Sequence, residues 1–403
     1  MSAVREPVFI VGLYKNGTSW LLAALAAHPQ FSALRELDVL RSVADCGRRV
    51  KLLPPRQRLA RVFGKSAFCG LRADMLAPGA FRAYADPSRL PAGVNSLYDL
   101  PAELAVEVIT AMQVDRIGKD VFQDVPADKP VKQGKPVGFA NLPRPLLAKA
   151  FTALRDAGDP ARAMHGFLDA LAPALPPERR LVLKGADQIN CFEVLRGYYP
   201  DAPKIAIVRD GRDAAVSAYH YRRLMQERGM AWQHGFLAIL RPIAALRTAL
   251  RRSIVALRRL FGYGADWRLG YTLKVWRHRV RLVLQAAERG ELYVLRYEDL
   301  LEDFEGSFGQ LLRWLGADAS PETLAAVRQA SSFESMSGRP RGVSAKDVVR
   351  KGVAREWLTE LTARDQALAW RIAGPELTAM GYTRDGHIGP FRAPGPAGRG
   401  GSK

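Results

Sequence analysis

The chain has 403 residues, of which 48% are hydrophobic and 25% charged, the balance of a soluble globular protein with one or two domains. Its 60 Lys and Arg residues against 40 Asp and Glu leave a net charge of +20, so phosphate, sulfate, nucleic acid and anionic lipid are all attracted. Cys46, Cys69 and Cys191 are odd in number and far apart, which excludes a disulfide framework and a Cys-x-x-Cys metal site. The first residues are not typical of a secretory leader, and Arg or Lys interrupts every apolar run before the ~18 residues that a membrane-spanning helix needs. We therefore expect a cytoplasmic protein.

Four short apolar runs are typical of buried parallel strands. They are Pro7–Gly12, Leu181–Gly185, Ile205–Arg209 and Leu292–Arg296. Helical patterns follow two of these runs, at Thr18–His28 before Pro29 and at Asp213–Arg228. Strands that alternate with helices predict an α/β fold with an open parallel sheet flanked by helices, in which ligands bind at the carboxyl ends of the strands.

Residues 236–262 form a segment of a different kind. From Phe236 to Phe261 apolar residues recur at helical spacing, and six arginines lie beside them on an arc of about 140°. This pattern predicts a basic amphipathic helix inserted into the fold. Such helices bind membrane surfaces, or pack on their own core or on a second copy of the chain, and the pattern leaves both open. Residues 386–403 are rich in Gly and Pro and are predicted to be disordered.

A loop at residues 12–20 (GLYKNGTSW) joins the first predicted strand to the first predicted helix. Backbone N–H groups at such a junction can hold an anion. The glycine spacing fits the nucleotide-triphosphate loop GxxxxGK[ST], but Thr18 stands where that loop has Lys, and the lysine, Lys15, comes three residues earlier. The segment instead resembles the 5′-phosphosulfate loop of sulfotransferases that use 3′-phosphoadenosine-5′-phosphosulfate (PAPS), written YPKSGTTW in the cytosolic branch. The resemblance implies that the phosphosulfate is held by Lys15, Asn16, Gly17, Thr18, Ser19 and Trp20.

Two further segments resemble the part of the same family that binds the 3′-phosphate of PAPS. In residues 207–217 (IVRDGRDAAVS), Arg209 and Ser217 take the family's positions. An Arg at a strand end offers a planar fork to phosphate oxygens, and a Ser early in the next helix adds a neutral donor near the helix dipole. Arg350, Lys351 and Gly352, before Trp357, are similar to the family's RKGxxGDW. We expect Ala354 in place of the second glycine and Glu356 in place of the aspartate.

Two shorter matches follow in the order the family has them. Tyr297 lies in RYEDL, and Phe333 in SSFESM takes the place of the aromatic that stacks on adenine. The resemblance implies a P-loop-like α/β sulfotransferase domain over residues 1–385, with residues 44–138 as a variable region that shapes the acceptor pocket. It also implies PAPS as the donor, 3′,5′-diphosphoadenosine (PAP) as the product, and no metal.

The expected chemistry is in-line attack of an acceptor on the sulfuryl sulfur, and a lysine directed at the growing negative charge would stabilise it. Lys15 is that residue. Lys184, in LVLKGAD, matches the Lys of the family's KTH segment and is expected to touch the sulfuryl group. The His of that segment is replaced by Ala186. Other branches of the family have a Glu shortly after a His-Pro pair, so Glu36 is the expected base and Asp187 is the alternative.

We therefore predict a sulfotransferase that acts on a hydroxyl or amine of a small molecule, a glycan or a lipid-linked acceptor. One alternative is a P-loop kinase, which Thr18 and the lack of a clear Mg²⁺-binding carboxylate disfavour. Another is a non-catalytic basic protein that binds membrane surfaces. The expected partners are PAPS, the acceptor and an anionic membrane surface that residues 236–261 would contact from the cytoplasmic side, but no nucleic acid. The acceptor and the oligomeric state stay open.

Overall fold

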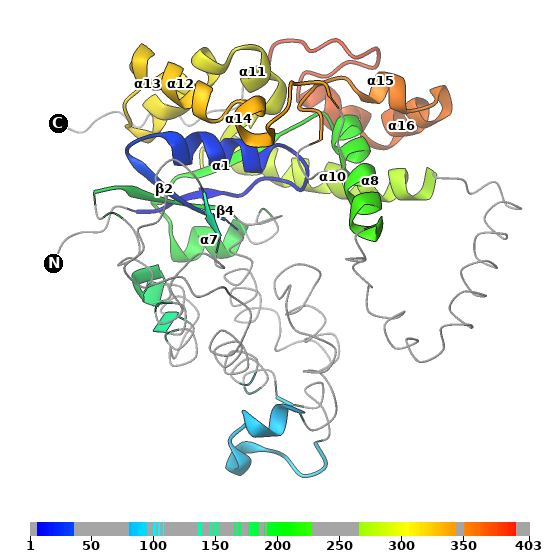
Figure 1. Ribbon diagram of the computed structural model, residues 1–403. Coiled ribbons are helices and arrows are strands. Elements are labelled where there is room, and N and C mark those ends of the chain that lie inside the picture. Colours follow the sequence, from blue (N-terminus) through cyan, green and yellow to red (C-terminus); the bar gives the residue numbers. More distant parts are fainter. Residues whose placement is uncertain are drawn as a thin grey trace, which may run out of the picture. The chain divides into compact units, whose positions relative to one another are not determined.

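The computed structural model describes residues 6–35, 80–94, 178–184, 192–227, 266–343 and 350–391, with short pieces between 100 and 189 (Figure 1). Those pieces are residues 100–101, 104, 108, 136–138, 146, 149–150, 153, 165–166, 168–170, 176 and 189. The predicted amphipathic helix at 236–261 lies outside the described residues, as do Glu36, Asp187, residues 392–403 and most of residues 44–138.

Six strands form one sheet in the order β3-β2-β4-β1-β5-β6. Their bounds are β1 Val8–Ile10, β2 Phe31–Arg35, β3 Val137–Gly138, β4 Arg180–Lys184, β5 Lys204–Val208 and β6 Tyr293–Arg296. The pairs β2·β3, β2·β4, β1·β4 and β1·β5 are parallel. All three side chains of β1 are fully buried, and so are the four apolar ones of β5. Strands covered on both faces explain why these runs are continuously apolar rather than alternating.

Contacts within the described chain divide it into two compact units. The first takes residues from 1–12, 18–205 and 309–330, and the second from 13–17, 206–308 and 331–403. The boundary falls inside β5, so that residues 204–205 belong to the first unit and residues 206–208 to the second. The loop after β1 belongs to the second unit, although its flanking strand and helix belong to the first.

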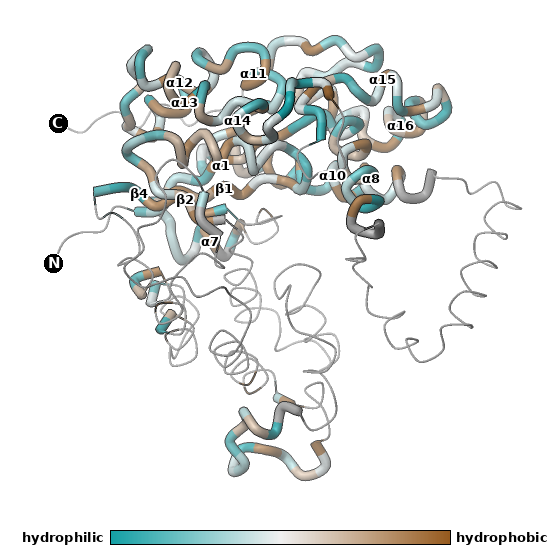
Figure 2. The backbone as a smooth tube through the Cα atoms, in the orientation of Figure 1, coloured by the Kyte–Doolittle hydropathy of each residue, from teal (hydrophilic) through white to brown (hydrophobic). Residues whose placement is uncertain are grey.

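The first unit contains β1 to β4, the start of β5, and the helix α1 (Thr18–Ala27), which packs on β2, β4 and α13 (Pro321–Ala330). Helix α1 is apolar on nearly every face, as its colour in Figure 2 shows, and seven of its residues are buried. It ends before Pro29, because the residue ahead of a proline disfavours helical backbone. The unit also holds the short helices η3 (Ala80–Ala83), η4 (Pro87–Arg89) and α7 (Phe192–Tyr198).

The second unit is built on three long helices that pack on one another: α8 (Gly211–Glu227), α10 (Asp266–Glu288) and α16 (Ala363–Ala379). Shorter helices complete it: α11 (Tyr297–Glu302), α14 (Phe333–Ser337) and α15 (Trp357–Glu360), of which α15 packs on α8. Helix α12 (Phe304–Leu315) crosses the boundary between the units. None of the helices in the described ranges is long and apolar enough to cross a membrane.

The predicted fold class is confirmed: an α/β protein with an open sheet, parallel at each of the pairs named above and flanked by helices. The four predicted strands correspond to β1, β4, β5 and β6, and the two predicted helices to α1 and α8, with ends that coincide or differ by one or two residues. Strands β2 and β3 were not predicted. Strand β2 begins two residues after the proline that follows α1. Its sequence, FSALR, contains polar residues and is not typical of a buried strand.

The start of the predicted disordered tail makes ordered contacts. Tyr382 and Ile388 form an antiparallel bridge, and the Gly389 N–H donates to the Gly381 carbonyl at 2.8 Å. Arg296 donates from Nη1 to the Gly389 carbonyl at 2.8 Å, and its guanidinium lies over the ring of Phe391. The prediction of disorder rested on the Gly and Pro content of this segment, and that content does not show that an arginine distant in the sequence binds its backbone.

Candidate functional site

The loop between β1 and α1 has two residues in the left-handed region, Lys15 at φ 64° and Gly17 at φ 96°. A Cβ on Gly17 would lie 2.5 Å from Cδ2 of Tyr297, so only glycine allows the loop backbone to approach this ring. Asn16 is buried and uses both ends of its amide: Oδ1 accepts from the N–H of Arg209 at 2.7 Å, and Nδ2 donates to the Tyr14 carbonyl at 2.9 Å. The amide of Asn16 therefore fixes the loop to the end of β5.

The remaining loop residues of the motif open α1 in the first unit. Thr18 is buried, Ser19 is exposed and Trp20 is half-buried. Lys184, the last residue of β4, is also buried and donates from Nζ to Oγ of Ser19 at 3.4 Å. The first unit thus brings together two residues that the resemblance assigned to the sulfuryl end of the donor.

Arg209 follows β5 and is buried in the second unit. Its Nη2 donates to the Val353 carbonyl at 2.7 Å and lies 3.4 Å from Oδ2 of Asp213, while its guanidinium stacks 4.7 Å from the ring centre of Tyr297. The Nε of Arg209 is buried and has no hydrogen-bond partner in the described part of the chain. Ser217 lies half-buried in the second turn of α8.

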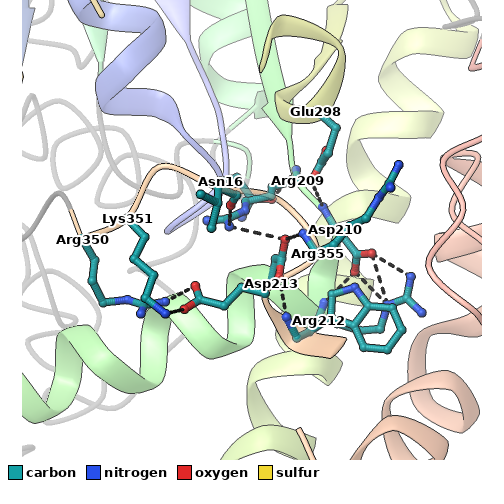
Figure 3. A network of polar contacts seen from close by, with 12 residues as sticks. Asn16, Arg209, Asp210, Arg212, Asp213, Glu298, Arg350, Lys351 and Arg355 are labelled. Atoms are coloured by element: carbon teal, nitrogen blue, oxygen red, sulfur yellow. Dashed lines mark hydrogen bonds and ion pairs between the residues drawn. The ribbon is translucent and has the colours of Figure 1, made fainter. Parts of the chain in front are cut away.

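Asp213 joins the start of α8 to the segment that contains RKG (Figure 3). Its carboxylate accepts from the backbone N–H of Arg355 at 2.7 Å and from that of Trp357 at 2.9 Å, in addition to its ion pair with Arg209. The Asp213 side chain has no exposed surface. This single carboxylate therefore sets where the RKG segment lies with respect to Arg209.

Arg350 and Lys351 share one carboxylate, that of Glu356, with Lys351 Nζ 2.8 Å from Oε1 (Figure 3). The Nε of Arg350, like that of Arg209, is buried without a hydrogen-bond partner among the residues described. Gly352 has φ 67°, and a Cβ there would lie 2.3 Å from Cδ2 of Phe333. Phe333 is therefore packed directly against the backbone of this segment.

The expectation that Ala354 replaces the second glycine of RKGxxGDW is wrong. Counting from Arg350 puts that glycine at position 355, and Arg355 is the residue with φ 61°. Glycine adopts this conformation at no steric cost, whereas Arg does not. The two hydrogen bonds to Asp213 on either side of Glu356 hold the segment in this shape.

Sequence reasoning missed the carboxylate of Glu298, which lies beside Tyr297 in RYEDL. Glu298 is buried, accepts from the hydroxyl of Tyr382 at 2.7 Å through Oε2 and from the N–H of Asp210 at 3.1 Å through Oε1. Burial raises the pKa of Glu298 to about 7, against the lowering effect of the hydrogen bond from Tyr382. The sequence does not show that this carboxylate is buried, because its neighbours in RYEDL include other charged residues.

Glu298→Gln is expected to change how stability depends on pH. The pKa of Glu298 rises from an ordinary 4.5 to about 7 on folding, so between these values the folded protein holds a proton that the unfolded chain has lost. The free energy of unfolding therefore falls as pH rises through this window, by about 2 kcal/mol that the Gln variant should not lose. Urea unfolding of both proteins at pH 5 and pH 7 measures this difference. Glu322→Gln, on the exposed face of α13, is the control, and equal pH dependence in all three proteins would contradict the assignment.

The residues of the second unit that are predicted to bind the donor come from three separate stretches of sequence. The loop contributes Lys15 to Gly17, the β5–α8 junction contributes Arg209 and Ser217, and Tyr297, Phe333 and the RKG segment lie in the C-terminal stretch. Tyr297 touches two of these stretches, because its ring meets both Gly17 and Arg209. The ring of Tyr297 thus brings the loop and the predicted 3′-phosphate segment together.

Comparison with known proteins gives one family match. Residues 199–381 match the family model described as "Sulfotransferase domain". No curated protein matches the sequence. The matched range contains β5, α8, RYEDL, Phe333 and the RKG segment, whereas the loop at 12–20 lies before it.

Sulfotransferases are among the solved structures to which the chain is similar. A mouse sulfotransferase complexed with PAP is 18% identical, with 58% of this chain and 78% of that chain covered and a TM-score of 0.35. Sulfotransferase STF9 from Mycobacterium avium is 16% identical, with 96% and 79% covered and a TM-score of 0.40. The sulfotransferase domain of the olefin synthase from Synechococcus is 15% identical, with 92% and 93% covered and a TM-score of 0.41. The family match thus makes residues 199–381 of this chain similar to sulfotransferase domains.

Proposed function

We propose that this protein transfers a sulfuryl group from PAPS to a hydroxyl or amine acceptor. The observation that carries the proposal is the pair of buried guanidinium Nε–H groups, of Arg209 and Arg350, that have no partner within the described residues. A buried donor without an acceptor is costly, and a phosphate supplies several charged acceptors at once. Both arginines stand where the sulfotransferase motifs place ligands of the 3′-phosphate.

The remaining residues fit the same ligand. Ser217, Lys351 and the backbone at Gly352 would complete the 3′-phosphate site, and Phe333 would stack on the adenine. The backbone N–H groups of residues 15–20 would hold the 5′-phosphosulfate, because a loop with two left-handed residues before a helix turns successive N–H groups toward one point. Tyr297 would support both parts through its contacts with Gly17 and Arg209.

PAPS supplies the sulfuryl group and, as PAP, the leaving group. In the transfer, the acceptor oxygen or nitrogen forms a bond to sulfur while the bond from sulfur to the bridging phosphate oxygen breaks, and that oxygen keeps the electron pair. Lys15 would stabilise the charge on the bridging oxygen, and Lys184 would act on the sulfuryl oxygens. Glu36, or Asp187 in its place, would accept the proton that the acceptor loses. No residue in this scheme requires a metal.

The sequence outside the described residues suggests where the acceptor binds. Residues 44–138, within a domain of residues 1–385, would shape the acceptor pocket. The basic pattern at 236–261 would rest on an anionic membrane surface from the cytoplasmic side, which would suit a lipid-linked acceptor. The net charge of +20 supports this placement.

Calorimetric titration with PAP, AMP and ATP, without Mg²⁺, tests the proposed donor site. PAP and AMP share adenosine and a 5′-phosphate, and only PAP has the 3′-phosphate that Arg209 and Arg350 would contact. Charge-assisted hydrogen bonds of this kind should make PAP bind at least about 10-fold more tightly than AMP. Equal affinities would overturn the assignment and would fit a protein that binds anions by charge alone. Preference for ATP that grows with Mg²⁺ would favour a kinase instead.

A further inference from the structure

The ammonium group of Lys15 lies over the ring of one tyrosine, and a second tyrosine packs against that ring. The Nζ of Lys15 lies 4.6 Å from the ring centre of Tyr221, which is on α8. The ring of Tyr14 meets that of Tyr221 edge to face, with centres 5.8 Å apart and an angle of 76°. A cation over an aromatic face within about 6 Å is attracted by the ring's electron density. Tyr221 therefore holds Lys15 on one side, and Tyr14 fixes the ring from another.

The backbone of the loop supports this contact. Lys15 is one of two non-glycine residues with positive φ in the described chain, and this conformation is unfavourable for a residue with a Cβ. The amide of Asn16 anchors the neighbouring residue to β5, which keeps the loop in this shape. The direction in which the Lys15 side chain leaves the loop is thus set by the backbone, and the ring of Tyr221 sets where its ammonium group ends.

The position of Tyr221 on α8 connects it to the rest of the site. Tyr221 follows Ser217 by four residues, so the two side chains lie on the same face of the helix. Helix α8 is held by α10, α15 and α16, which makes it a rigid support. A lysine side chain has four rotatable bonds and loses much conformational freedom when it is fixed in one place. A ring on a rigid helix restricts the lysine side chain before the reaction begins, so that less conformational entropy is lost in the reaction itself.

We propose that Tyr221 is a positioning residue for Lys15: its ring holds the ammonium group by a cation–π contact and so directs it toward the reacting group. The proposal rests on the proposed function, in which Lys15 stabilises the leaving oxygen of PAPS. Tyr221 itself makes no bond to the reacting atoms. Its aromatic face is required, and its hydroxyl is not.

Nuclear magnetic resonance of methylated lysines tests the contact without an acceptor. Reductive methylation with isotope-labelled formaldehyde keeps the charge of each lysine and gives it a methyl signal, and the signal missing from Lys15→Arg identifies Lys15. A methyl group over a ring is shifted upfield by the ring current. We expect this shift in the wild type and in Tyr221→Phe, and its loss in Tyr221→Leu and Tyr221→Gln. One aliphatic and one polar replacement are included, so that the test can still be made if one of the two variants does not fold.

Turnover gives the second measurement, as the rate of PAP release from PAPS with water as the acceptor. Loss of one cation–π contact should slow this rate roughly fivefold in Tyr221→Leu, whereas Tyr221→Phe should recover most of it. PAP, which has no sulfuryl group, should bind all variants almost equally. An unchanged Lys15 signal and an unchanged rate in Tyr221→Leu would overturn the proposal. If the wild type does not prefer PAP to AMP, the proposed function fails instead. The methyl signal still tests the contact between Lys15 and Tyr221 in that case.

Discussion

Lys15→Ala is expected to slow sulfuryl transfer by about 100-fold or more while it weakens PAP binding by less than about tenfold. The reason is that charge on the bridging oxygen grows only in the transition state, whereas the backbone of the loop and the arginines of the proposed 3′-phosphate site would bind the ground state. The rate is measured as PAP formed from PAPS in a single turnover, and the affinity by calorimetry with PAP. Equal losses in rate and affinity would assign Lys15 to ground-state binding.

Two controls separate this effect from general damage. Lys274→Ala removes one positive charge from the exposed face of α10, and its rate should equal that of the wild type. The loop itself should survive the loss of Lys15, because it is held by the amide of Asn16 and by the contact of Gly17 with Tyr297. Lys15→Gly relieves the positive φ of this position and removes the same amine. A glycine variant that is as slow as the alanine variant would show that the amine, and not backbone strain, accounts for the effect.

The fold was largely predictable where burial is complete. Strands β1 and β5 lie inside the sheet, so every one of their apolar residues is covered and the sequence shows an uninterrupted apolar run. The same argument fails for β2 and β3, which are five and two residues long and carry no such run. The neighbouring strand determines the pairing of β2: Ser32 and Ala33 pair with Leu181 and Val182 of β4. Tertiary pairing of this kind leaves little local trace.

The sequence names the residues of the candidate site, which stay a prediction, but it does not show how they are arranged. A motif names Arg209 and Arg350, yet nothing in it shows that Asp213 would reach a backbone N–H 142 residues away at Arg355. Nor does the motif show that Glu298 is buried, which raises its pKa against the lowering effect of the hydrogen bond from Tyr382. Tyr221 could not be named either, because a tyrosine on a helix becomes informative only when a cation is found over its ring.

Arg350→Ala is expected to weaken PAP binding by about 10- to 100-fold and to leave AMP binding unchanged. The buried Nε of Arg350 has no partner in the described part of the chain, which makes it a donor that a 3′-phosphate can use and AMP cannot. Arg350 is a safer site for this test than Arg209. After its removal Glu356 keeps Lys351 at 2.8 Å, whereas removal of Arg209 would leave the fully buried Asp213 without its cation.

The matched control for this test is Arg355→Ala. Arg355 lies five residues away in the same segment, its side chain is 48% exposed, and its only ion pair among the described residues is with Glu302 at 3.7 Å. Alanine keeps the strain of its positive φ and the hydrogen bond from its N–H to Asp213, so only one surface charge is lost. An exposed charge of this kind has little effect on affinity. Because the control removes the same charge, a loss of PAP affinity in Arg350→Ala alone assigns the effect to a direct contact. A parallel loss for AMP in Arg350→Ala would instead place Arg350 away from the 3′-phosphate.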